Sequence, residues 1–143
     1  MIRALCGKVK QKHVGNVVSS SLTDECDIMV KKQDFFHQVN KLLCEYQGVR
    51  HDILTELFSK YCTSYYGSQA WDLRSQHVAT FHTAWNKAAR RVLKLPFNSH
   101  RYFLHALLNV EPIQIVLQKR FLKLCMTMEK SKNDIVSYCY RFF

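Results

Sequence analysis

The sequence predicts a mainly α protein, a helical bundle of five or six helices preceded by a short β-hairpin remnant. Only four glycines and two prolines occur among its 143 residues, which favours long helices over an all-β fold. Apolar residues also recur three or four positions apart over most of the chain, which is typical of one face of a helix. We therefore expect a hairpin and a serine-rich loop over residues 1–22, and a single helical domain over residues 23–143.

The N-terminal stretch HVGNVVSS, residues 13–20, differs from the rest. It places β-branched residues around a glycine and then enters a triple serine. This composition predicts a short strand or hairpin followed by a loop.

The ends of the expected helices are indicated by capping residues and by glycine and proline, which terminate helices. Acidic residues at the start of the first helix suit the positive end of its dipole, and proline disfavours helix in the residue before it. Proline in a first turn is well tolerated. The segments run from Thr23 or Asp24 to Gly48, from about Ile53 to Gly67, from Ser75 as N-cap to Pro96, from Asn98 or Ser99 through Leu107, from Pro112 through Met128, and from Ser131 with Asp134 to the aromatic tail Tyr138, Tyr140, Phe142 and Phe143.

Two roles are open for the aromatic residues in and after the second helix: stacking on bases and packing in the core. Tyr61, Tyr65, Tyr66 and Trp71 could stack on bases, but at helical spacing such residues usually belong to a core. We expect Tyr61 and Trp71 in the core and Tyr66 at the surface.

The charge of the chain is strongly positive and uneven. Lysine and arginine number 21 against 11 acids, a formal net charge of +10. Residues 1–23 hold no acid, and neither do residues 73–110, which contain six cations and four histidines. This asymmetry points to a polyanion such as nucleic acid, with an anionic membrane as the rival and a merely soluble basic protein as the bland alternative.

The cations concentrate in AWNKAARRVLKLP, residues 84–96. Read as a helix, this stretch places Lys87, Arg90, Arg91 and Lys94 on one face, opposite an apolar face. Such a stripe would neutralise backbone phosphates without reading sequence, because Asn86 is the only nearby amide suited to a base edge. Further cations that could extend the stripe are Arg101, Lys119, Arg120 and Lys123.

Other chemistry finds little support in the sequence. The six cysteines show no CxxC spacing and favour a reduced, intracellular chain, nuclear or cytoplasmic. The histidine pairs His77/His82 and His100/His105 are five residues apart, which is poor spacing for two ligands on one helix turn, so no metal and no cofactor are expected. No phosphate-binding glycine loop, signal peptide or transmembrane segment is predicted, and the alanine-rich apolar face with Trp85 suits helix packing better than lipid.

The order of these segments resembles the end of the palm, the thumb and the following helices of a non-LTR (LINE-type) retrotransposon reverse transcriptase, an RNA-directed DNA polymerase. Individually weak patterns carry the likeness through their order over nearly the whole chain. They are HVGNVV (13–18), VNKLLCEY (39–46), LFSKYCTSYYGSQAWDL (57–73), AWNKAARRVLKLPFNSH (84–100) and IVLQKRFLKL (115–124).

The resemblance implies a thumb-like bundle that holds a template–primer duplex, whether DNA, an RNA–DNA hybrid or structured RNA. It also implies a primer-grip-like element at His13, Val14 and Gly15, with Val14 where the family usually has leucine. No Asp-Asp pair for two-metal catalysis and no Cys/His zinc knuckle occur in the chain, so we expect no polymerase activity from these residues alone. The alternatives are a helical protein-interaction module and a non-functional relic of a retrotransposon.

Overall fold

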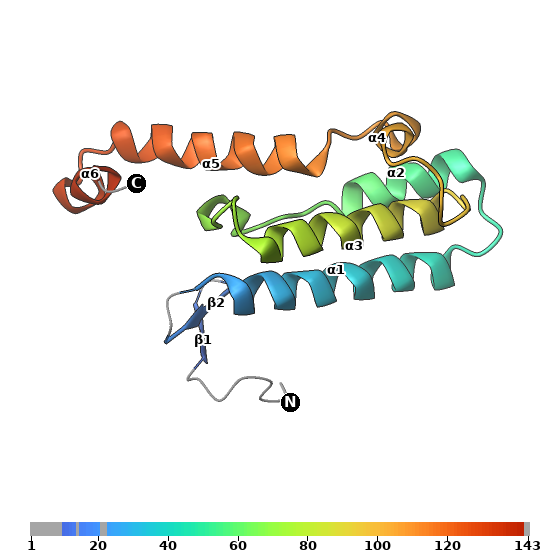
Figure 1. Cartoon of the computed structure of the whole chain (residues 1–143), viewed down its shortest axis with the longest axis horizontal. Coiled ribbons are helices and arrows are strands. Elements are labelled where there is room, and N and C mark those ends of the chain that lie inside the picture. Colours follow the sequence, from blue (N-terminus) through green and yellow to red (C-terminus); the bar gives the residue numbers. More distant parts are fainter. Residues whose placement is uncertain (1–9, 14, 21–22, 142–143) are drawn as a thin grey trace.

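The computed structural model describes residues 10–13, 15–20 and 23–141, and it confirms the mainly α class (Figure 1). The described residues form six α-helices and one antiparallel hairpin. The elements are β1 (Lys10–His13), β2 (Asn16–Ser19), α1 (Glu25–Glu45), α2 (His51–Tyr61), the 3₁₀ turn η1 (Ser68–Ala70), α3 (Gln76–Val92), α4 (Tyr102–Leu108), α5 (Ile113–Glu129) and α6 (Asp134–Tyr140).

The predicted N-terminal hairpin is present and is anchored to α1. Its register pairs Lys10 with Ser19 and His13 with Asn16. The carboxylate of Asp27 fixes its position, because Oδ1 accepts from the backbone N–H of Val17 at 2.9 Å and Oδ2 accepts from the indole N–H of Trp71 at 2.8 Å. Asp27 therefore joins the hairpin, α1 and the segment before α3, instead of serving only the helix dipole.

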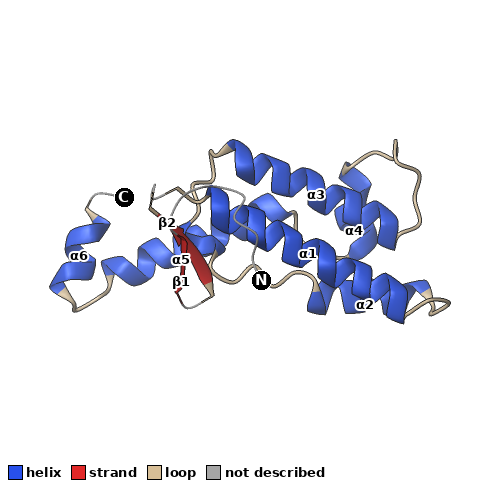
Figure 2. Ribbon diagram, turned by 90° about the horizontal axis from the view of Figure 1, so that it is seen from below, coloured by secondary structure: helices blue, strands red, loops and turns tan. Residues whose placement is uncertain are grey.

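The core lies where α1, α2 and α3 pack together, and Figures 1 and 2 both show α1 and α3 side by side. Its centre is a group of aromatic rings, with Phe58 and Trp85 at 6.1 Å and Phe35 and Phe81 at 5.8 Å between ring centroids. Trp71 is buried against Phe81, as predicted. These packed aromatic rings join side chains from all three helices in one core.

The second helix is shorter than predicted, and the prediction of a core position for Tyr61 is wrong. Helix α2 ends at Tyr61, whose side chain is 66% exposed. The α-helix ends before Cys62, and Tyr65 then turns inward and packs edge-on against Phe81 with ring centroids 5.9 Å apart. Trp71 packs edge-on against the same ring at 5.7 Å. Tyr66 is exposed, as predicted.

Helix α4 begins at Tyr102 with Arg101 at its N-cap, so the expected cap at Asn98 or Ser99 is wrong. Leu104 and Leu108 are buried, whereas Tyr102, Phe103 and Leu107 are exposed. A helix of two turns covers its neighbours with a single i, i+4 pair, and here that pair faces α2 and α3.

The first half of α5 packs against η1 and α3, whereas its second half and α6 project beyond the three-helix core (Figure 1). Only Ile113 and Leu117, near the start of α5, are buried. Helix α6 is capped by Asn133, whose side chain accepts from the N–H of Ile135 at 2.9 Å, so the expected start at Ser131 is two residues early. Tyr138 is exposed, while Phe142 and Phe143 lie outside the described residues.

Candidate nucleic-acid interface

The exposed face of α3 carries the predicted cations in its C-terminal half. Ser75 caps the helix, as predicted, because its hydroxyl accepts from the backbone N–H of His77 at 3.2 Å. The buried stripe faces α1, α2 and α4, which leaves Lys87 and Arg91 exposed one turn apart. Within the described residues the side chain of Lys87 makes no hydrogen bond or ion pair.

Lys94 is exposed but does not lie on the helix, because α3 ends at Val92 instead of continuing to Leu95. Lys94 adopts a left-handed conformation with φ of 52°. The N–H of Leu95 then bonds to the carbonyl of Arg90 at 2.9 Å, and the N–H of Lys94 to that of Arg91 at 3.2 Å. These two bonds form a Schellman motif, which explains why the helix stops four residues before Pro96.

Arg90 points its guanidinium back into the fold. Nε and Nη2 donate to the carbonyl of Ser99 at 3.0 and 2.8 Å, and Nη1 donates to the carbonyl of Asn86 at 3.3 Å. The side chain is half-buried. Arg90 thus fastens the loop between α3 and α4, and its donors are engaged within the protein.

Arg91 connects the exposed face of α3 to α1. Its Nη1 donates to Oδ1 of Asn40 at 2.8 Å, while the guanidinium stays exposed. One amide partner leaves other donors of Arg91 available to an anion. Lys87, Arg91 and Lys94 together are called the basic face below.

The four cations proposed as extensions do not share one environment. Arg101 is exposed and lies over the ring of Tyr102 at 5.4 Å. Lys119 is paired with Glu111, whereas Arg120 is half-buried and donates to the carbonyl of Tyr65 at 2.5 Å. Lys123 is exposed.

The cations of α5 lie toward the opposite end of α3 from the basic face. Tyr65, the partner of Arg120, packs on Phe81 in the N-terminal half of α3. Beyond Arg120 the helix continues toward α6 (Figure 1). The fold therefore brings Lys87, Arg91 and Lys94 together with Arg101 nearby in sequence, and it does not align all eight residues in a single stripe.

His13 and Gly15, two of the residues expected to form a primer-grip-like element, lie at the turn of the hairpin. His13 ends β1 and pairs with Asn16, Val14 lies outside the described residues, and Gly15 has φ of +84°. The carbonyl of Gly15 accepts from Nζ of Lys31 at 3.0 Å, and this ammonium also lies 5.9 Å from the ring centre of Tyr66. Contacts with α1 and with the segment after α2 thus hold the turn, and no sequence signal marked Lys31 for this role.

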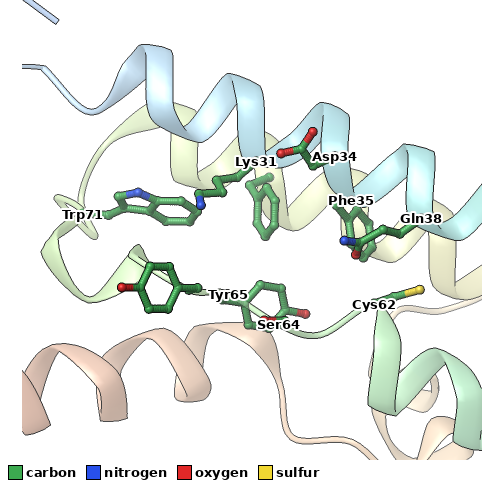
Figure 3. Close-up of a pocket in the computed structure, with 10 residues that line it drawn as sticks. Lys31, Asp34, Phe35, Gln38, Cys62, Ser64, Tyr65 and Trp71 are labelled. Atoms are coloured by element: carbon green, nitrogen blue, oxygen red, sulfur yellow. The ribbon is translucent and has the colours of Figure 1, made fainter. Parts of the chain in front are cut away.

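A pocket of about 190 Å³ lies beside this turn, between α1 and the segment that follows α2 (Figure 3). Figure 3 shows Lys31, Asp34 and Gln38 entering from α1, and Tyr65 and Trp71 closing the other side. Burial raises the pKa of the Cys62 thiol to about 11, so this cysteine is protonated and unreactive at neutral pH. The Cys62 thiol is therefore not an activated nucleophile in this pocket.

Two further classes of site find no support in the part of the chain that the structure describes. No group of three or more histidine, cysteine, aspartate or glutamate side chains is arranged to hold a metal ion among these residues. None of their helices is both long and apolar enough to cross a membrane.

Comparison of this chain with protein-family models, with curated protein sequences and with solved structures gives no match. The candidate interface therefore stands on its own geometry and charge.

Proposed function

We propose that this chain is a sequence-independent nucleic-acid-binding module that contacts backbone phosphates of a duplex through Lys87, Arg91 and Lys94. The observation that carries the proposal is the exposure of these three cations within a stretch that contains no acid, residues 73–110. Phosphate contacts of this kind position a duplex without reading its bases. The likeness of the segment order to a LINE-type reverse transcriptase supports a template–primer duplex as the ligand.

The experiment is a salt titration of duplex binding. Three phosphate contacts give a slope of log K against log salt of about −3 on duplex DNA. The double variant K87A/R91A should reduce the slope to about −1 and weaken binding equally for unrelated sequences. The slope is measured by fluorescence anisotropy on two duplexes of different sequence and equal length.

A matched control changes the net charge by the same amount elsewhere. Arg50 and Lys60 are exposed on α2 and its N-terminal flank, and each pairs with a nearby acid, Asp52 and Glu56. R50A/K60A should leave the slope unchanged. Equal losses in both double variants would show that net charge alone drives binding and would overturn the proposed interface.

A second candidate function, a protein-interaction module, is favoured by a different surface. Leu122 and Met126 on α5 and Ile135 on α6 are exposed apolar side chains. Exposed apolar residues that gather on neighbouring elements are typical of protein contacts. Retention of protein partners by the nuclease-treated chain, together with failure to shift a duplex in a gel, would favour this function over nucleic-acid binding.

A further inference from the structure

A second pocket lies between α3, α4 and the first turn of α5. Its volume is about 410 Å³, which falls in the range of pockets that hold small organic ligands. His82 and Asn86 reach it from α3, Arg101, Tyr102 and His105 from the start and middle of α4, and Ile115 from α5.

Two histidines of the lining each have one buried ring nitrogen that has no hydrogen-bond partner within the described residues. These atoms are Nε2 of His82 and Nδ1 of His105. Burial lowers the pKa of both rings, and the neighbouring His105 lowers that of His82 further, so both are neutral at neutral pH. A neutral imidazole offers one donor and one acceptor. Because a buried polar atom without a partner is costly, these nitrogens are suited to a ligand that supplies hydrogen bonds.

The pocket also has flat aromatic walls whose orientation is set by stacking. The ring of His105 stacks on Trp85 at 4.6 Å with an interplanar angle of 16°. Tyr102 is exposed, its ring stacks with that of His100 at 5.6 Å between centroids, and the guanidinium carbon of Arg101 lies 5.4 Å from its ring centre. Flat apolar surfaces next to fixed hydrogen-bonding groups match a nucleobase, which has two apolar faces and a polar edge.

The charge around the pocket argues against a metal ion. Its lining contains the guanidinium of Arg101 and no carboxylate. A cation held by two imidazoles would face Arg101 without compensation, whereas a phosphate would pair with it. The chemistry of the lining therefore selects a planar, hydrogen-bonding ligand that carries negative charge.

We propose that this pocket binds a single nucleotide, with its base against Tyr102, Ile115 and the two histidine rings, the polar edge of the base at the side-chain amide of Asn86, and its phosphate at Arg101. Asn86 of the pocket lining directly precedes Lys87 of the basic face on α3. One source of this nucleotide is the single-stranded end of a bound duplex, and this source rests on the proposed function. The other is a free nucleoside monophosphate, which does not.

The first arm of the test isolates the base at a duplex end. Two duplexes differ only in their one-nucleotide 3′ overhang, which carries adenine in one and an abasic sugar in the other. The adenine overhang should bind roughly five-fold tighter or more, because stacking of one base on aromatic side chains has this effect. H82L and N86A should abolish the preference, while H51L, a change at an exposed histidine of α2, should preserve it.

The second arm uses adenosine monophosphate alone, followed through the histidine side-chain NMR signals of the full chain. Shifts at His82 and His105 in the wild type that disappear in N86A, without an overhang preference, would assign the pocket to free nucleotides. If H82L does not fold, N86A decides the outcome. Absence of both effects, or an overhang preference that survives in both variants, would overturn the proposal.

The two arms also separate this proposal from the proposed function. Failure of the pocket leaves the salt slope and the effect of K87A/R91A intact. Failure of duplex binding leaves the arm with adenosine monophosphate as a complete test of the pocket.

Discussion

Replacement of Arg90 by methionine should destabilise the fold without changing the salt dependence of nucleic-acid binding. Methionine keeps the apolar part of the side chain but removes the donors that bond Ser99 at 2.8 and 3.0 Å. Hydrogen bonds from a charged donor contribute about 1.5–3 kcal/mol, and the half-buried position calls for a value of about 2 kcal/mol. For a chain of this size, about 2 kcal/mol corresponds to a fall in Tm of about 6–8 °C.

The companion variant R90K separates charge from geometry. Lysine restores the positive charge but has no planar fork, so it cannot reproduce the paired bonds to one carbonyl. The Tm of R90K, measured by thermal denaturation with circular dichroism, should therefore be close to that of R90M. Both variants should keep the wild-type salt slope at a temperature where they are folded. An unchanged Tm, together with a slope that R90M reduces by about 0.9 and R90K restores, would refute this reasoning and return Arg90 to the phosphate-binding set.

Three other predictions test the fold around the interface. In D27N the NH₂ group of asparagine would face the N–H of either Val17 or Trp71, both of which donate to Asp27. D27N should therefore lower the free energy of unfolding by about 2 kcal/mol in urea denaturation. An unchanged midpoint would show that the carboxylate is dispensable. The positive φ of Lys94 is unfavourable for a residue with a side chain, so K94G should raise the free energy of unfolding by about 0.5–1 kcal/mol. The same variant should reduce the salt slope by about 0.9, because it removes one cation. A lower free energy of unfolding in K94G would contradict the argument from φ. Burial lowers the pKa of His82 and His105, so as the pH falls the unfolded rings, with a pKa of about 6.5, bind protons before the folded ones. The free energy of unfolding should therefore fall as the pH drops from 7 to 5. H82Q should flatten this dependence, and an equally steep profile in the variant would show that other groups cause it.

The sequence predicted the elements whose evidence is local. Apolar periodicity placed α1, α3 and α5 within a few residues of their observed bounds, and Ser75 is the N-cap of α3. Glycine within a β-branched stretch predicted the hairpin. Each of these features depends on neighbouring residues along the chain, and short-range spacing and capping chemistry are enough to specify it.

The errors arise where a tertiary contact overrides the local pattern. The apolar spacing of Tyr61 and Tyr65 continued the helix, but burial of Tyr65 against Phe81 stabilises a break after Tyr61. The sequence predicts that α3 continues to the residue before Pro96, because no sequence rule favours lysine in the left-handed conformation that Lys94 adopts. A single sequence does not contain the packing alternatives that decide between such endings.

The sequence predicted which cations would cluster at the candidate site, but it did not predict which of them would form hydrogen bonds within the protein. Helical spacing grouped four cations, yet it could not show that Arg90 turns to Ser99. The sequence also did not predict that His82 and His105 line one pocket, because they lie on different helices, 23 residues apart in the chain. Side chains from different helices meet through the fold, so spacing along one helix has no information about them.

The position of each cation along α3 separates a structural from a functional reason for its charge. The negative end of the helix dipole favours cations in the last turn, where Arg90 and Arg91 lie, by about 0.3–1 kcal/mol each. Lys87 lies before that turn, and its like charge four residues from Arg91 opposes helix stability. Helix energetics alone therefore accounts for Arg90 and Arg91 but not for Lys87. An anionic partner accounts for an exposed Lys87 in a segment without acids, and for this reason Lys87 is the cation whose removal most directly distinguishes binding from helix stabilisation.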